Sequence, residues 1–191
     1  MSVTRRRPVL FATALAIMAA STLGGAASAG TASATTPFCG ITWGSLPKAG
    51  GALHQAPLVT TRTGQHPCYD RLVFEFDGNA DGYRTEYASE VYTEGQGLAL
   101  SGQTAGGALI KVVLLEPTTD LSGQGTYANP VGGHVANVGG YQTLRDVVFG
   151  GSFEGYTTFA VGVRARLPFR VFVLSGPGSH TRIVLDVAHR W

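Results

Sequence analysis

Apolar and polar residues alternate along most of this chain, and two segments carry the same alternating pattern. Residues 71–76 and 182–187 each contain an arginine, two aliphatic residues, a bulky apolar residue, an acid and a further apolar residue. Successive side chains of an extended chain point to opposite faces. Each segment therefore predicts a strand with one apolar face and one face on which an arginine and an acid flank a valine.

Other segments follow the same period of two, and glycine-rich turns separate them. The predicted strands cover residues 58–63, 70–76, 83–91, 109–115, 153–163, 169–174 and 181–187. The nearly continuous apolar run at 109–115 predicts a strand covered on both sides. A tight turn at Gly176-Pro177-Gly178 predicts that the last two strands form an antiparallel hairpin. Residues 141–148 fit a short helix and a strand equally well.

Helical periodicity is nearly absent, because apolar residues recur at a spacing of two and glycine interrupts each candidate window. The chain contains 27 glycines and 9 prolines, and 44% of its residues are hydrophobic, which is enough for a packed core with many turns. We therefore predict an all-β fold, a single-domain β-sandwich or open barrel of about seven to nine mainly antiparallel strands.

The N-terminal segment has the pattern of a secretory signal peptide. Three arginines at residues 5–7 precede an apolar run that ends near residue 20, and small residues follow. We expect a signal peptide over residues 1–29, with cleavage as late as residue 34, and a flexible leader over residues 30–38. The folded domain is then expected over residues 39–191. The arginines fit a general secretory signal and a twin-arginine signal alike.

The apolar run is shorter than the roughly 20 residues that a transmembrane helix needs. No later segment is long and apolar enough either, so we expect an exported protein without a membrane span. No cysteine follows the apolar run in the position of a lipid anchor, since Cys39 lies farther downstream. The expected location is therefore secreted, extracellular or associated with the cell wall.

Removal of the signal peptide changes the charge of the protein. The whole chain has 14 Lys and Arg against 12 Asp and Glu, and cleavage removes three of the arginines, which leaves a formal charge near −1. The basic character of the whole chain is therefore not a sign of nucleic-acid binding.

The chain contains two cysteines, Cys39 and Cys68. Oxidising conditions outside the cytoplasm allow a disulfide between them, and neither cysteine lies in a motif with metal-ligand spacing. We predict that they pair. A reactive thiol or a metal ligand is the functional alternative.

The two repeated segments provide the first candidate binding residues. In an antiparallel pairing Arg71 would lie opposite Asp186, and Arg182 would lie opposite Glu75. A parallel pairing would bring arginines together, so the pattern favours an antiparallel pair or no direct pairing. The structural interpretation is a set of solvated ion pairs, each worth about 0–1 kcal/mol. The functional interpretation is a polar groove whose arginines bind the carboxylates of a glycan or peptide.

Aromatic residues and one long connection provide the other candidate binding residues. Tyr83 and Tyr87 lie on one face of a predicted strand and can stack on sugar rings, although aromatic residues in strands usually pack in the core. The connection over residues 118–140 has no sustained period, and loops longer than about 12–15 residues are often functional or disordered. Its candidate contact residues are Asp120, Tyr127, Asn129, His134 and Asn137.

No motif marks a catalytic or metal site. The five histidines show no ligand spacing, and no serine lies at the centre of a GxSxG motif. An acid–base pair could arise only if the fold brought together carboxylates that no motif marks: Glu90, Glu94, Asp120 and Glu154. We therefore expect no enzyme, no catalytic residue, no metal and no cofactor.

Several segments together carry a resemblance to a known family. They are Asp70 to Phe76, Gly82-Tyr83 with Tyr87, Phe153 to Gly155, Pro168 to Val171, and Arg182 to Val187 with His189. In these segments the chain resembles the AMIN-like domain of secreted proteins and lipoproteins from high-GC Gram-positive bacteria. The resemblance covers most of the chain from about residue 60. It implies a β-sandwich related to AMIN domains, which accompany cell-wall amidases and secretins and look like targeting or peptidoglycan-binding units. It implies no catalytic residues.

Three functional hypotheses follow. The first is a non-catalytic, secreted cell-envelope module that binds peptidoglycan or another wall glycan through a sheet face and the 118–140 connection. Its main expected contacts are Arg71, Arg182, Tyr83 and Tyr87. The second is a protein that binds or inhibits another envelope protein through an exposed strand edge. The third is a wall-acting hydrolase that uses unmarked carboxylates.

Overall fold

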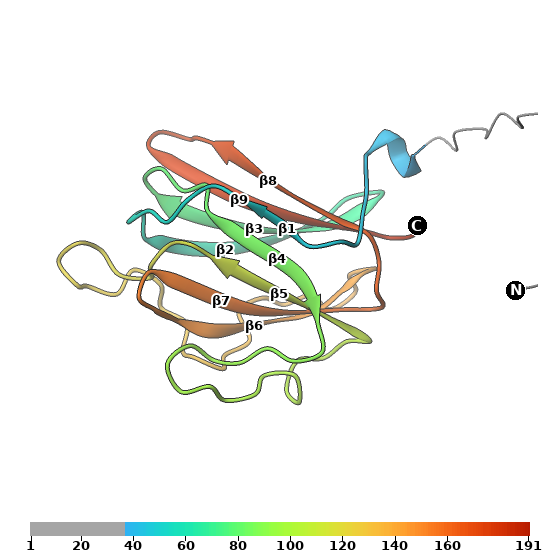
Figure 1. Cartoon of the computed structure of the whole chain (residues 1–191). Helices are drawn as coiled ribbons and strands as arrows, with labels where there is room; N and C mark the ends of the chain where they lie inside the picture. The colour runs from blue at the N-terminus through green and yellow to red at the C-terminus, as the bar shows by residue number, and fades with distance from the viewer. Residues whose placement is uncertain (1–36) are drawn as a thin grey trace, which may run out of the picture. The chain divides into compact units, whose positions relative to one another are not determined.

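The computed structural model describes residues 37–191, so the predicted signal peptide and most of the predicted leader lie outside the described residues. Within this range nine strands form two separate antiparallel sheets, which face each other as two layers (Figure 1). The regular helical structure of the same range is one short 3-10 turn at Phe38–Gly40. The all-β prediction is confirmed, and the architecture is a β-sandwich rather than a closed barrel.

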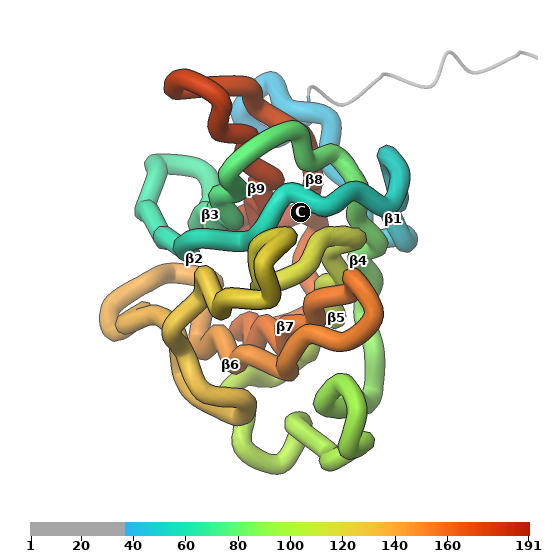
Figure 2. The backbone as a smooth tube through the Cα atoms, turned by 90° about the vertical axis from the view of Figure 1, so that its left-hand side faces the viewer, coloured from blue at the N-terminus to red at the C-terminus, as the bar shows by residue number. Residues whose placement is uncertain are grey.

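The five-stranded sheet contains, in spatial order, β1 (Lys48–Gly50), β4 (Tyr83–Ala88), β5 (Ala108–Leu114), β7 (Tyr156–Val163) and β6 (Leu144–Phe153). The four-stranded sheet contains β2 (Leu58–Gln65), β3 (Tyr69–Asp77), β9 (His180–Ala188) and β8 (Phe169–Ser175). Figure 2 shows the layer of β2, β3 and β9 above the layer of β5, β6 and β7.

The two repeated segments lie side by side as β3 and β9. They pair antiparallel, with Arg71 opposite Asp186 and Glu75 opposite Arg182. Of the two arrangements that the pattern favoured, an antiparallel pair or no direct pairing, the structure has the antiparallel pair. The predicted hairpin of the last two strands is also present, because β8 pairs with β9 through the turn that contains Gly176-Pro177-Gly178.

The apolar faces of β3 and β9 point into the space between the sheets. Phe74 of β3 packs on Phe159 of β7, with ring centroids 4.9 Å apart. The fully buried apolar side chains on these two faces are Leu72, Phe74, Phe76, Ile183, Leu185 and Val187. Burial of each such side chain contributes about 1.5–3 kcal/mol relative to exposure, so this shared apolar face provides much of the core.

Three local predictions need correction or completion. The segment 141–148 fitted a short helix and a strand equally well. Its residues from Leu144 onward form the first part of β6, because they pair with β7. The segment 153–163 is not one strand. Glu154 and Gly155 both have positive φ and form a hairpin turn between β6 and β7. Residues 48–50 form the short edge strand β1, which their glycine-rich surroundings concealed.

The strand β5 is not covered on both sides along its length. Ile110, Val112 and Leu114 are buried, whereas Lys111 and Val113 are half-exposed on the outer face of the sheet. The loop that follows β4 packs Val91 and Leu100 over one end of the sheet only. The apolar run at 109–115 therefore led to a wrong prediction that both faces of β5 are covered along its length.

The 118–140 connection is packed against the sandwich. Its backbone bonds to the outer edge of β6, where the Val135 amide donates to the Val147 carbonyl at 2.8 Å and the Phe149 amide donates to the Gly133 carbonyl at 3.0 Å. Covering an edge strand in this way removes a template for aggregation. The connection is therefore part of the fold rather than a free excursion.

Cys39 and Cys68 form the predicted disulfide, which spans 29 residues of sequence. It joins the 3-10 turn near the start of the described chain to the residue before β3. Within residues 37–191, no helix has the length and apolar character needed to cross a bilayer.

Candidate functional site

The outer face of the four-stranded sheet carries four arginines, and we call it the arginine face. Arg62 lies on β2, Arg71 on β3, Arg182 on β9 and Arg170 on β8. They project outward because they alternate with the core residues of each strand. Three carboxylates, Glu75, Asp77 and Asp186, share this face. Four cations against three anions leave the arginine face with a formal surplus of one positive charge.

Asp186 is the centre of the arginine face. Its side chain is fully buried, and two guanidinium groups enclose it. Arg71 binds it with two bonds, from Nε to Oδ1 at 2.6 Å and from Nη2 to Oδ2 at 2.9 Å. Arg170 donates from Nε to Oδ2 at 2.8 Å. The hydrogen bond to Asp186 raises the pKa of Arg71 above its ordinary value. One buried carboxylate thus holds two cations in fixed positions.

Three aromatic rings surround these cations. The guanidinium carbon of Arg170 lies 4.9 Å from the ring centroid of Phe172, 5.3 Å from that of Tyr69 and 5.5 Å from that of Trp43. These distances fit cation–π contacts. All three rings are half-buried, so part of each remains at the surface. We call the group of Trp43, Tyr69, Arg71, Arg170 and Phe172 around Asp186 the aromatic–arginine cluster.

Arg182 does not form the expected ion pair with Glu75, although the two residues lie opposite each other. Glu75 is instead engaged by Arg62 from the neighbouring strand and by His180, whose Nδ1 lies 2.8 Å from Oε1. The Arg182 guanidinium donates to the carbonyl of Ser175 at 3.4 Å. The third strand, β2, therefore provides the arginine that binds Glu75, a role that the two-strand pattern assigned to Arg182.

Tyr83 and Tyr87 are half-buried and lie against the core, as aromatic residues in strands usually do. The Tyr87 hydroxyl donates to the Leu167 carbonyl at 2.7 Å and accepts from the Leu167 amide at 2.9 Å. Burial raises the pKa of Tyr87. Because side chains alternate along β4, the outward positions are Arg84 and Glu86 instead.

The candidate residues of the 118–140 connection mainly hold that segment together. Tyr127 is buried, and its hydroxyl lies 2.9 Å from that of Thr61. Burial raises the pKa of Tyr127, and the hydrogen bond with Thr61 partly opposes this shift. Tyr127 is therefore part of the core, and Asn129 is half-buried two residues after it.

The polar residues of the connection have local partners too. The Asp120 carboxylate accepts from the Ser122 side chain at 2.6 Å and from the Gln124 amide at 2.9 Å. These bonds hold the pKa of Asp120 below its ordinary value. His134 is largely exposed, and its Nδ1 lies 2.8 Å from Asp146 Oδ1. The Asn137 side chain accepts from the Gly139 amide at 3.1 Å. The structure thus assigns each of them a role in local folding.

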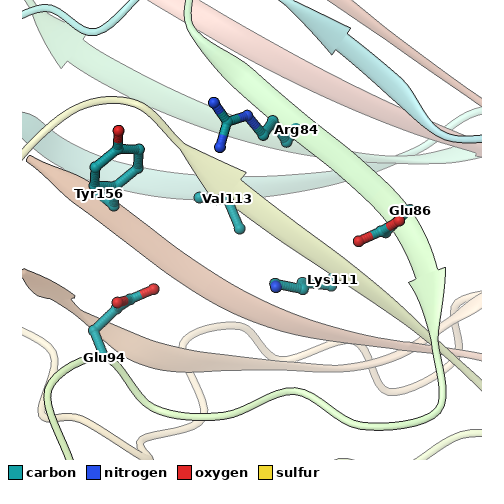
Figure 3. A pocket seen from close by; sticks show the side chains of 6 residues that line it. All are labelled: Arg84, Glu86, Glu94, Lys111, Val113 and Tyr156. Carbon is teal, nitrogen blue, oxygen red and sulfur yellow. The ribbon is translucent and has the colours of Figure 1, made fainter. Parts of the chain in front are cut away.

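The outer face of the five-stranded sheet contains a pocket of about 390 Å³, which we call the mixed-charge pocket. Figure 3 shows its lining: Arg84 and Glu86 from β4, Lys111 and Val113 from β5, Tyr156 from β7, and Glu94 from the loop after β4. Among the carboxylates considered from sequence, Glu94 is part of this pocket. The other lining residues were missed, although their outward positions on predicted strands could have indicated them.

A carboxyl group with a strongly altered pKa lies elsewhere. Glu116, just after β5, is fully buried, and burial raises its pKa to about 8. Its Oε2 accepts from the Ala56 amide at 3.2 Å, and its Oε1 has no partner among the described residues. A neutral carboxyl group is the state that such an environment favours. Its burial separates it from ligands at the surface.

A comparison with known families identifies the fold. The family model of the AMIN-like domain matches residues 56–189. The chain belongs to the AMIN-like domain family. This AMIN-like protein is thereby grouped with cell-envelope related modules. The matched region includes Arg71, Arg170 and Asp186, whereas Trp43 and Cys39 precede it. No curated protein and no solved structure matches the chain.

Proposed function

We propose that this AMIN-like protein is a secreted, non-catalytic module that binds peptidoglycan or another wall glycan through the arginine face. The observation that carries the proposal is the aromatic–arginine cluster. Arg71 and Arg170 retain 22% and 31% side-chain exposure although both bind the buried Asp186. Cations held at the surface beside aromatic rings combine two kinds of contact that suit an acidic carbohydrate polymer.

The chemistry of each contact is specific. Aromatic faces present large apolar surfaces on which sugar rings can stack. A guanidinium group has five N–H donors, and those not bound to Asp186 can bind a carboxylate or carbonyl oxygen of the polymer. Because Asp186 and the rings already fix the guanidinium groups, binding orders few additional side chains, which reduces its entropic cost.

The charge distribution supports an acidic ligand. The arginine face has four arginines against three carboxylates, Glu75, Asp77 and Asp186, whereas the chain without its predicted signal peptide carries a formal charge near −1. The positive charge is therefore local. Binding to a polymer with carboxylates should weaken with salt, because the Debye length falls from about 10 Å at 0.1 M to about 3 Å at 1 M ionic strength.

Co-sedimentation of the oxidised protein with purified cell-wall sacculi across a salt series tests this proposal. The test variant combines Arg170→Gln with Phe172→Ser, which removes one cation and one ring but leaves both Arg71 bonds to Asp186 in place. We expect salt-sensitive retention of the wild-type protein and a loss of about tenfold in the variant, since a hydrogen bond to a charged group contributes about 1.5–3 kcal/mol.

Arg145→Gln is the matched control. Arg145 lies on β6 of the other sheet and donates to the backbone carbonyls of residues 141, 142 and 144. This variant should sediment like the wild-type protein. If the wild-type protein stays in solution at each salt concentration, or if both variants lose retention equally, wall binding through the arginine face is wrong. Capture of a purified envelope protein would then favour the partner-binding alternative.

A further inference from the structure

The mixed-charge pocket differs from the centre of the arginine face because its charges are not paired. Arg84, Glu86, Lys111 and Glu94 line one hollow, yet none of them takes part in an ion pair within residues 37–191. Charged groups that lie close together usually gain by pairing. Here the four side chains surround an open space instead.

The arrangement of the charges alternates in sign. Figure 3 shows the four charged side chains around Val113 in the order Arg84, Glu86, Lys111 and Glu94, with Tyr156 between Glu94 and Arg84. The backbone explains this order, because Arg84 and Glu86 both project outward from β4 while Lys111 of β5 lies opposite Glu86 in the register. The half-exposed side chain of Val113 forms an apolar floor.

Glu94 is held in position for binding. Its Oε1 accepts from the Thr158 hydroxyl at 2.7 Å, and its backbone amide donates to the Gly150 carbonyl at 2.8 Å. These two bonds attach the loop residue to β7 and β6. A carboxylate fixed from below by a hydroxyl retains acceptor positions for a second donor.

We propose that the mixed-charge pocket binds a small zwitterion, an amino acid or a dipeptide with a free ammonium group and a free carboxylate. The carboxylate binds the Arg84 guanidinium, and the ammonium group binds Glu94. Lys111 and Glu86 provide the second cation and anion of the rim. The pocket volume of about 390 Å³ lies in the range of about 300–1,000 Å³ for small-molecule sites and suits a ligand of this size.

The balance of charge provides the selectivity. An anion would be attracted by Arg84 and Lys111 but repelled by the two carboxylates. A cation would be attracted by the two carboxylates but repelled by Arg84 and Lys111. A zwitterion satisfies both sets of groups. This inference does not depend on wall binding, because the pocket and the arginine face lie on different sheets.

An NMR titration of the oxidised protein with glycylglycine tests the inference. N-acetylglycylglycine, which lacks the ammonium group, and glycylglycinamide, which lacks the carboxylate, are the matched probes. We expect saturable amide shifts in β4, in β5 and near Glu94, with a dissociation constant on the order of 1 mM. Each capped probe should bind at least about tenfold more weakly, because one charged pocket group loses its partner.

Two variants assign the ends of the ligand. Arg84→Gln should no longer distinguish glycylglycine from glycylglycinamide, and Glu94→Gln should no longer distinguish it from N-acetylglycylglycine. Arg145→Gln should behave as the wild-type protein does, and the dispersion of the amide spectrum verifies the fold of each variant. If Arg84→Gln perturbs the fold, Lys111→Gln serves as the second test of the cationic side. We expect this variant to bind glycylglycine more weakly than the wild-type protein does.

Equal binding of either capped probe would overturn the zwitterion assignment, and so would shifts confined to other surfaces or no saturable shift with glycylglycine. Discrimination that survives in both variants would overturn it as well. Sacculus retention is expected to be unchanged in Arg84→Gln and Glu94→Gln. Failure of this inference is therefore distinguishable from failure of the proposed function.

Discussion

The two outer faces of the sandwich use arginines and carboxylates in opposite ways. On the arginine face, Asp186 is buried and binds Arg71 and Arg170, while aromatic rings cover the guanidinium groups. In the mixed-charge pocket, Arg84 and Glu94 line a hollow and form no ion pair with other described residues. The first face has a surplus of positive charge, and the second has equal numbers of cations and anions.

This difference shows that the placement of a carboxylate decides what an arginine can do. A carboxylate buried under two guanidinium groups turns them into rigid, positively charged surface groups suited to an extended acidic ligand. A carboxylate beside a hollow leaves each charge available to a compact ligand with both signs. Pairing therefore contributes to the fold on one face, and its absence creates a binding site on the other.

The largest effect is expected from Asp186→Ala, which removes the shared partner of two cations. Removal of the buried carboxylate leaves two partly exposed guanidinium groups side by side without their anion, so we expect a loss of up to about 3–5 kcal/mol, the range for breaking a buried ion pair. Denaturant unfolding followed by circular dichroism measures the loss of free energy of unfolding. Glu94→Ala is the control on the other face. If Asp186→Ala costs less than about 1 kcal/mol, the arginine face is as loosely paired as the mixed-charge pocket.

The next largest effect is expected from removal of the disulfide, which we expect to change the arginine face and not the mixed-charge pocket. Cys39→Ser combined with Cys68→Ser opens a link across 29 residues, and the chain-entropy relation gives a loss of about 3–4 kcal/mol. The change also releases the segment that carries Trp43. We expect weaker retention on sacculi and unchanged affinity for glycylglycine under conditions where the variant is folded. Equal losses in both assays would show that the two faces are not independent.

Glu116 provides a third test, because it is a buried carboxyl group without a cation, unlike Asp186. Its pKa is about 8 in the folded protein against an ordinary value of 4.5. Between these values the folded state binds more protons than the unfolded state, so stability falls as the pH rises. We expect a loss of at least about 2 kcal/mol in the free energy of unfolding between about pH 5 and pH 8.

Glu116→Gln checks the origin of this pH dependence. Glutamine keeps an acceptor for the Ala56 amide but does not ionise. The free energy of unfolding of this variant should therefore fall less than that of the wild-type protein over the same pH range. Parallel curves for the two proteins would mean that Glu116 is not the group responsible.

The smallest effects are expected in the mixed-charge pocket. Glu86→Gln and Lys111→Gln remove groups that form no ion pair among the described residues, so each should change the free energy of unfolding by less than about 0.5 kcal/mol. Denaturant unfolding is again the measurement. A loss above about 1 kcal/mol in either variant would reveal a stabilising pairing and would remove the contrast between the faces.

Much of the four-stranded sheet could be predicted from the sequence. The period of two placed Leu72 and Phe74 in the core, and charge complementarity placed Arg71 opposite Asp186. These predictions succeeded because they depend on the alternation of side chains within one strand and on a repeated motif. The disulfide followed from the presence of two cysteines in a chain whose N-terminal pattern predicts export.

Residues contributed by a third strand could not be predicted in this way. Arg170 joins Asp186 because β8 lies beside β9 in one register, and Arg62 reaches Glu75 because β2 lies beside β3. The mixed-charge pocket combines two strands, the start of a third and a loop, which lie far apart in sequence. No local pattern specifies such a combination, since each member is an ordinary surface residue of its own segment.

The sequence by itself determined that this protein is all-β, that β3 and β9 are equivalent strands, and which faces of these strands are apolar. Local alternation and turn residues are sufficient for these features, because they depend on neighbours along the chain. Only the tertiary structure decided that Tyr83 and Tyr87 pack against the core and that Asp186 binds two arginines. Both outcomes depend on which strands become neighbours and on which side the second sheet packs, and long-range packing alone sets those relations.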